Sequence, residues 1–102
     1  MDTEQATPAD PPTALDYLIR ASDAFVATLP LYGAQVTRLE HQRAGRLTDY
    51  AYRCAERAAR AAGRDPEQFG TAVAARDMAD RAQVIVRAIY DTRHARFAGK
   101  AA

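Results

Sequence analysis

The sequence predicts an all-α protein built from three helices. Apolar residues recur at helical spacing through most of the 102 residues, and Pro30, Gly33, Gly63 and Pro66 separate the periodic segments. Alanine, the strongest helix former, supplies 24 residues. Leu, Ile, Val and Phe together supply only 17, so the core must be thin. Small domains with thin cores often gain stability by association, and we expect an oligomer.

A chain of this length is expected to form one small domain. Residues 1–12 contain three prolines, three acids and no large apolar side chain after Met1, which is typical of a disordered acidic arm. The helical domain is expected over residues 13–98, with a flexible tail at 99–102. The chain has neither a run of 18 apolar residues nor a signal-peptide pattern. We therefore expect a cytoplasmic protein without membrane contact, and the single cysteine, Cys54, fits a reducing compartment.

The first helix is expected over residues 13–29. Thr13 and Asp16 have the spacing of a capping box, in which two side chains satisfy free amides at a helix start. Pro30 and Gly33 end this helix in a turn or a kink. Its apolar stripe, expected to face the core, consists of Leu15, Leu18, Ser22, Phe25 and Leu29.

Two longer helices, over about 31–63 and 66–97, are expected to form a long antiparallel hairpin. Gly63 is a helix-ending residue, and Asp65, Pro66 and Gln68 have the pattern of a helix start. The first helix is about half as long as these two, so it covers only part of the hairpin. The expected inward positions of the second helix are Val36, Leu39, Leu47, Tyr50, Ala51, Cys54, Ala58 and Ala61. The third helix carries a heptad seam through Thr71, Ala75, Met78, Ala82, Ile85, Ile89, Thr92 and Arg96.

Five arginines lie within about 40° of one line along the second helix, at 100° per residue. They are Arg46, Arg53, Arg57, Arg60 and Arg64. Such a stripe suits the phosphate backbone of DNA and provides no sequence readout. The alternative is a solvated face, because Asp49 and Glu56 precede Arg53 and Arg60 by four residues, the favoured ion-pair order. Both interpretations remain open at the level of sequence.

The segment VIVRAIY is apolar on nearly every side of the third helix, and such a surface is normally buried. We expect burial between subunits, with packing inside one chain as the alternative. The predicted oligomer interface consists of Val84, Ile85, Val86, Ile89 and Tyr90.

Residues 40–45, EHQRAG, resemble the histidine phosphotransfer motif, in which an exposed helical histidine is followed by lysine three residues later and glycine four residues later. His41 and Gly45 match this spacing, while Ala44 occupies the lysine position and Arg43 lies one residue early. The resemblance implies a phosphoryl-accepting His41. The alternative is an ordinary surface histidine.

The sequence predicts no enzyme, no metal site and no cofactor. Metal-binding HExxH and CxxC spacings are absent, and Ser22, the only serine, lies in the apolar stripe without a histidine nearby. The function expected is an oligomerising scaffold or adaptor that contacts DNA. The architecture is similar to the helical-hairpin oligomerisation core of small terminase subunits, which package DNA in tailed phages and gene transfer particles. The alternative is a small regulator that binds a larger protein, as a phosphorelay component using His41 or as an inhibitor.

Overall fold

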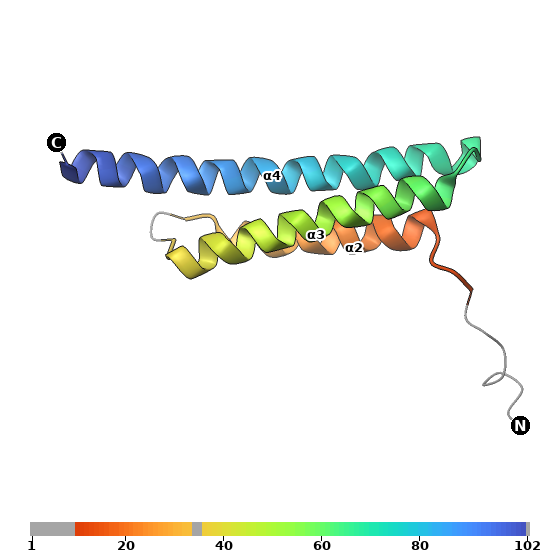
Figure 1. The fold of residues 1–102 in the computed structure, drawn as a ribbon, viewed down its shortest axis with the longest axis horizontal. Helices are drawn as coiled ribbons and strands as arrows, with labels where there is room; N and C mark the ends of the chain where they lie inside the picture. The colour runs from red at the N-terminus through yellow and green to blue at the C-terminus, as the bar shows by residue number, and fades with distance from the viewer. Residues whose placement is uncertain (1–9, 34–35, 102) are drawn as a thin grey trace, which may run out of the picture.

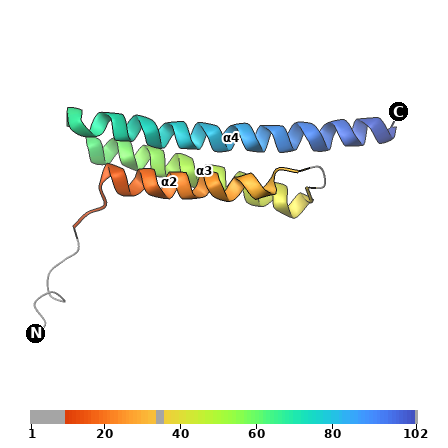
Figure 2. The same ribbon diagram turned by 180° about the vertical axis from the view of Figure 1, so that it is seen from behind.

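The computed structural model describes residues 10–33 and 36–101, with side chains up to Ala95. It contains α2 (Ala14–Thr28), the 3-10 turn η1 (Leu29–Leu31), α3 (Arg38–Ala62) and α4 (Pro66–Ala101). The predicted all-α class is confirmed for this part of the chain. The three helices lie side by side, and each packs against the other two (Figures 1 and 2). The arm predicted for residues 1–12 lies almost entirely outside the described residues.

The helix α2 begins where the sequence predicts. The Thr13 amide donates to Asp16 Oδ2 at 2.8 Å, and the Asp16 amide donates to Thr13 Oγ1 at 3.2 Å, which completes the capping box. The Thr13 amide and, at 3.1 Å, the Thr13 hydroxyl both donate to the Asp16 carboxylate, stabilise its charged form and so lower the pKa of Asp16. Pro30 then lies inside η1, so the expected turn at this proline is a single 3-10 turn.

The helix α3 begins later than predicted, at Arg38 rather than near residue 31. Its N-cap is Thr37, whose amide donates to Glu40 Oε1 at 3.0 Å while Thr37 Oγ1 accepts from the Glu40 amide at 3.1 Å. This second capping box places the start of α3 at Arg38, because its side chains satisfy the backbone amides of Thr37 and Glu40 that a longer helix would have bonded to its own carbonyl groups. At the other end Gly63 has a φ of 55°, a left-handed value that suits glycine and ends α3.

The start of α4 agrees with the prediction. Asp65 Oδ1 accepts from the Glu67 amide and Asp65 Oδ2 from Gln68 Nε2, both at 2.9 Å. These two bonds lower the pKa of Asp65, with Gln68 as the larger cause. The helix continues to Ala101, past the predicted end at 97, and it extends beyond the start of α3 (Figure 1). Most of the segment predicted as a tail, 99–102, is therefore helical backbone.

Alanine methyl groups form most of the core where the three helices meet. The main cluster consists of Ala14, Ala21, Ala24, Ala51, Cys54, Ala55, Ala58, Ala62, Ala75 and Ala79. A smaller cluster near the start of α3 contains Val36, Ala44 and Ile89, with Leu31, Ile85 and Val86 packed against it. The distance between two helix axes depends on the size of the side chains at their contact. The row of buried alanines in the main cluster, which we call the alanine contact line, therefore allows the helices to approach closely. No helix in the described part of the chain has an apolar stretch long enough to cross a bilayer.

We predict that enlarging one core alanine destabilises the bundle. Ala58 is fully buried and its neighbour Ala59 is exposed. Ala58→Leu should cost about 1–3 kcal/mol because the added carbons must force two helices apart. Ala59→Leu adds the same carbons on the outside and should change stability by less than about 0.5 kcal/mol. Thermal unfolding of both variants measures the difference, and equal melting temperatures would contradict this packing.

Candidate functional site

The outer surface of α3 carries four of the five predicted arginines. Arg46, Arg53, Arg57 and Arg60 are exposed, and at 100° per residue they lie on the side opposite the buried alanines of the same helix. We call these four residues the arginine face. Arg64 is exposed but follows Gly63, where the helix has ended, so helical spacing no longer places it in line with the others.

None of the four residues of the arginine face forms an ion pair with another described residue. The sequence offered Asp49 and Glu56 as partners of Arg53 and Arg60, but the ion pairs among the described residues lie on α4. There Arg76 Nε lies 3.3 Å from Asp80 Oδ1, and Arg81 Nε lies 2.8 Å from Asp77 Oδ2. Exposed pairs gain little energy in water and lose side-chain entropy, so correct spacing alone does not hold them together.

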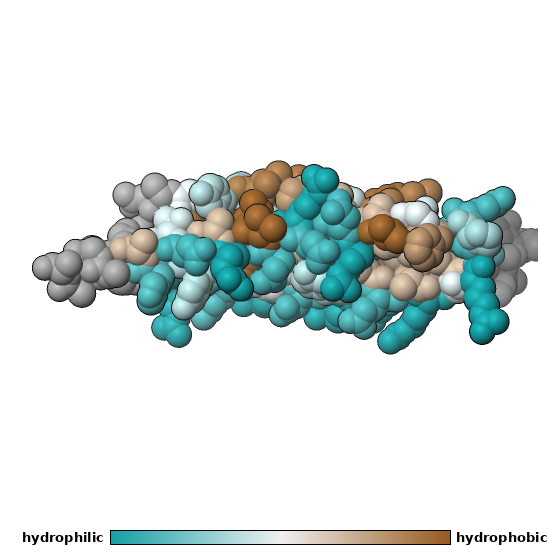
Figure 3. All heavy atoms as spheres, turned by 90° about the horizontal axis from the view of Figure 1, so that it is seen from above, coloured by the Kyte–Doolittle hydropathy of each residue, from teal (hydrophilic) through white to brown (hydrophobic). Residues whose placement is uncertain are grey.

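The predicted oligomer interface on α4 lies partly inside the chain. Ile89 is 1% exposed and belongs to the smaller core cluster, against which Ile85 and Val86 also pack. Packing within one chain therefore accounts for these three residues. Val84 and Tyr90 remain more than half exposed. Figure 3, which looks down on α4, shows hydrophobic patches separated by hydrophilic residues.

A second exposed apolar surface follows α2. Its buried residues are Ala14, Ala21, Ala24 and Thr28. Of the large side chains expected to face the core, Leu18 and Phe25 are partly buried, whereas Leu15 and Leu29 are exposed, so the prediction is wrong for the last two. Two further apolar residues, Ile19 and Val26, are exposed beside them. We call these four exposed residues the α2 stripe: Leu15 at 55%, Ile19 at 51%, Val26 at 57% and Leu29 at 45%. Steps of four and seven residues, then three, keep this set on one side of the helix.

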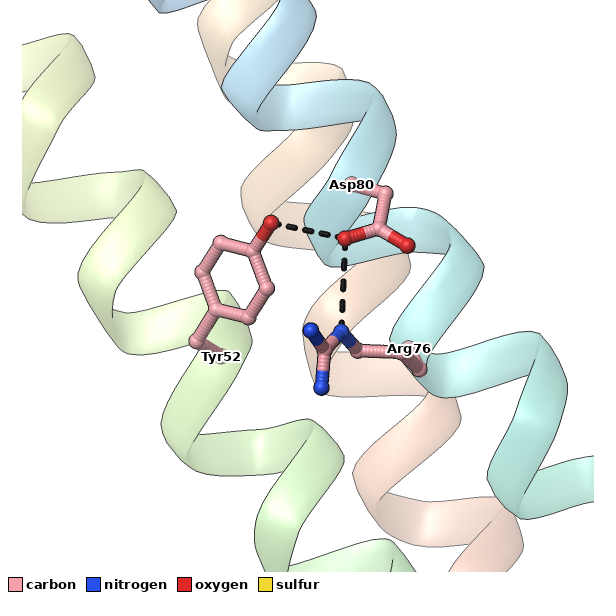
Figure 4. Close-up of polar contacts among 3 residues, drawn as sticks. All are labelled: Tyr52, Arg76 and Asp80. Carbon is pink, nitrogen blue, oxygen red and sulfur yellow. Dashed lines mark hydrogen bonds and ion pairs between the residues drawn. The ribbon is translucent and has the colours of Figure 1, made fainter.

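A polar link joins α3 to α4 at mid-length (Figure 4). The Tyr52 hydroxyl donates to Asp80 Oδ1 at 2.7 Å, and Arg76 Nε donates to the same oxygen at 3.3 Å. The Arg76 guanidinium also lies 5.0 Å from the Tyr52 ring centroid. The Tyr52 bond is the largest cause of the lowered pKa of Asp80, and its counterpart raises the pKa of the Tyr52 phenol.

Near the start of α3, six side chains from two helices line an open cleft of about 310 Å³. We call it the α3–α4 cleft; it is lined by Arg38, His41, Gln42, Tyr90, Arg93 and His94. The Tyr90 ring stacks on His94 with centroids 5.7 Å apart and planes 9° apart. His41 approaches the same ring, with centroids 6.2 Å apart. The two histidines, far apart in sequence, thus share one site.

The structure also places three residues that the sequence analysis considered for chemistry, Cys54, His41 and Gly45, all on α3. Cys54 is 2% exposed in the core. His41 is half-buried in the cleft, and a Cβ added at Gly45 would meet nothing within 4 Å, so the surface beside that glycine is open. The described residues hold no cluster of three or more His, Cys, Asp or Glu that could bind a metal ion.

Comparison of the chain with protein-family models, curated proteins and solved structures gives no match.

We predict that Tyr52→Phe raises the pKa of Asp80 towards its ordinary value of 3.8. A carboxylate whose pKa is lower in the folded than in the unfolded protein stabilises the fold at pH values above its unfolded-state pKa. This contribution to the free energy of unfolding is lost as the pH falls through the folded-state pKa. The stability difference between parent and variant should therefore shrink as the pH falls below about 4. Carboxyl NMR titration measures the pKa. Tyr50→Phe removes a hydroxyl elsewhere on α3 and should leave Asp80 unchanged.

Proposed function

We propose that the protein is a non-enzymatic helical adaptor that binds the backbone of a nucleic acid through the arginine face of α3. The observation that carries this proposal is that no carboxylate within the described part of the chain pairs with Arg46, Arg53, Arg57 or Arg60. Arginines that are not neutralised within the chain remain available to phosphates, with which the guanidinium fork makes bidentate hydrogen bonds.

The arrangement favours weak binding without sequence preference. Arg46 and Arg60 are fourteen residues apart, about 21 Å along a helix. One chain therefore neutralises at most about four phosphates, and phosphate contacts position a protein without reading bases. Useful affinity then requires several copies of the arginine face on one nucleic acid. This requirement links nucleic-acid binding to assembly of the chain.

We propose the α2 stripe as the surface for self-association. Its four large side chains are each close to half exposed, and contiguous apolar surface of this kind is typical of interaction sites. An assembly through α2 would leave the arginine face of α3 open. A DNA-packaging subunit of the small-terminase type is one setting in which such an assembly would work.

The α2 stripe also favours a second candidate, a regulator that binds a larger protein. An amphipathic helix from a partner could cover the same residues. The two candidates differ in the state of the isolated protein, because a protein-binding regulator need not self-associate.

We predict that the protein shifts DNA in a gel at about 50 mM salt and loses affinity as salt rises, with a slope of about 0.9 per phosphate contacted. Arg57→Gln with Arg60→Gln should weaken binding and reduce this slope by about two. Arg76→Gln with Arg81→Gln changes the net charge equally but removes arginines already paired on α4, so it should have a smaller effect. Absence of a shift by the parent protein would overturn the nucleic-acid proposal.

We predict that Ile19→Asp with Val26→Asp makes the protein monomeric in light scattering at tens of micromolar. Charges on this surface would have to be desolvated in the interface, which is costly. Val84→Asp is the matched control, because Val84 is 66% exposed on α4 and should leave the assembly intact. Dissociation by Val84→Asp alone would instead support the α4 interface, and a monomeric parent would favour the regulator.

A further inference from the structure

The α3–α4 cleft collects hydrogen-bond donors and cationic groups at one place. Arg38 and Arg93 supply two guanidinium groups, and His41 and His94 supply two imidazoles. Gln42 adds an amide and Tyr90 a phenol, so the six lining residues include no carboxylate. The lining comes from the first two turns of α3 and from α4 more than twenty residues past its start.

We propose that the α3–α4 cleft binds a phosphate monoester group. A tetrahedral oxyanion accepts hydrogen bonds from several directions, which suits donors on two opposing helices. Arginine forks match phosphate oxygens, and imidazole N–H groups donate hydrogen bonds to them. The six described lining residues include no carboxylate or thiolate ligand for a metal ion. A volume of about 310 Å³ is sufficient for a phosphate with a small organic group.

The helix dipole of α3 and the positions of the nearest carboxylates allow an anion to bind in the cleft. Arg38 is the first residue of α3, where the helix dipole places partial positive charge. Glu40 is the nearest acid in sequence on α3, and its carboxylate is bound by the Thr37 amide at 3.0 Å. Asp91 follows Tyr90 on α4 and is exposed. The bound anion would thus face the guanidiniums and imidazoles, with one acid already engaged in capping.

The cleft lies at the start of α3, and its residue Gln42 is one helical turn from Arg46, the nearest member of the arginine face. Arg57 and Arg60, which the DNA-binding test replaces, lie at least fifteen residues past Gln42, about 22 Å along the helix. Loss of DNA binding by that variant would therefore leave phosphate binding in the cleft unchanged.

The test is an NMR titration of the whole chain at pH 7.5 with inorganic phosphate and, separately, with O-phosphoserine. We expect saturable shifts confined to the six residues that line the cleft with both probes. If O-phosphoserine binds more tightly than inorganic phosphate, the natural ligand is a phosphorylated protein. If the two probes bind equally, the natural ligand is a small phosphate compound. Absence of saturable shifts at tens of millimolar of either probe would overturn the proposal.

A matched pair of variants locates the anion. Arg38→Gln should weaken phosphate binding about tenfold, the loss of one charge-assisted hydrogen bond. Arg43→Gln removes the same charge from an exposed position of α3 outside the cleft and should change affinity less than about twofold. Both residues are exposed, so both variants should fold. If the two variants weakened phosphate binding equally, binding would depend only on the net charge of the protein, and the proposed site would be wrong.

Discussion

The close approach of three helices along an alanine contact line determines the rest of the structure. Ala21, Ala51, Ala58, Ala75 and Ala79 are almost fully buried, and none carries a side chain longer than one methyl group. Each buried alanine removes little apolar area from water, so the bundle depends on dense dispersion contacts over its length. Larger apolar side chains are buried in the smaller cluster, where Val36 and Ile89 pack near the start of α3. Along the main cluster the buried side chains are alanines and Cys54, and the exposed apolar residues of α2 beside it form the α2 stripe.

The short connection between α3 and α4 fixes which residues meet across the two helices. Only Gly63, Arg64 and Asp65 separate the helices, so residues at similar sequence distances from this turn lie opposite each other. Tyr52 meets Asp80 in this way, and His41 meets Tyr90. The polar link and the α3–α4 cleft are therefore consequences of one turn, which depends on the positive φ of Gly63 and the cap by Asp65.

Local signals in the sequence predicted the local structure well. The Thr13 box and the cap by Asp65 place two helix starts correctly, and the same logic applied to Thr37 and Glu40 would have placed the third. The predicted inward positions are confirmed in part. Those that are buried are Val36, Ala51, Cys54, Ala58, Ala75, Ala82 and Ile89, and those that are exposed are Leu15, Leu29, Leu39, Tyr50 and Ala61. Helical spacing does not separate the two groups, because residues at the margin of a helix contact repeat with the same period as those at its centre. The i,i+4 ion pairs that spacing allows on α3 do not form among the described residues, because exposed pairs gain little energy in water. His41 and His94 both approach the Tyr90 ring because the turn pairs α3 with α4, and helical spacing within one segment does not contain that pairing.

Burial of Cys54 makes the thiol a kinetic reporter of bundle opening. The side chain is 2% exposed and is packed within the main alanine cluster. A thiol reagent cannot reach it while the three helices are closed, so alkylation must proceed through opened molecules. When reclosing is fast relative to reaction, the alkylation rate reports the free energy of opening at this position under native conditions. Because the full sequence contains one cysteine, the signal comes from a single site at the centre of the contact line.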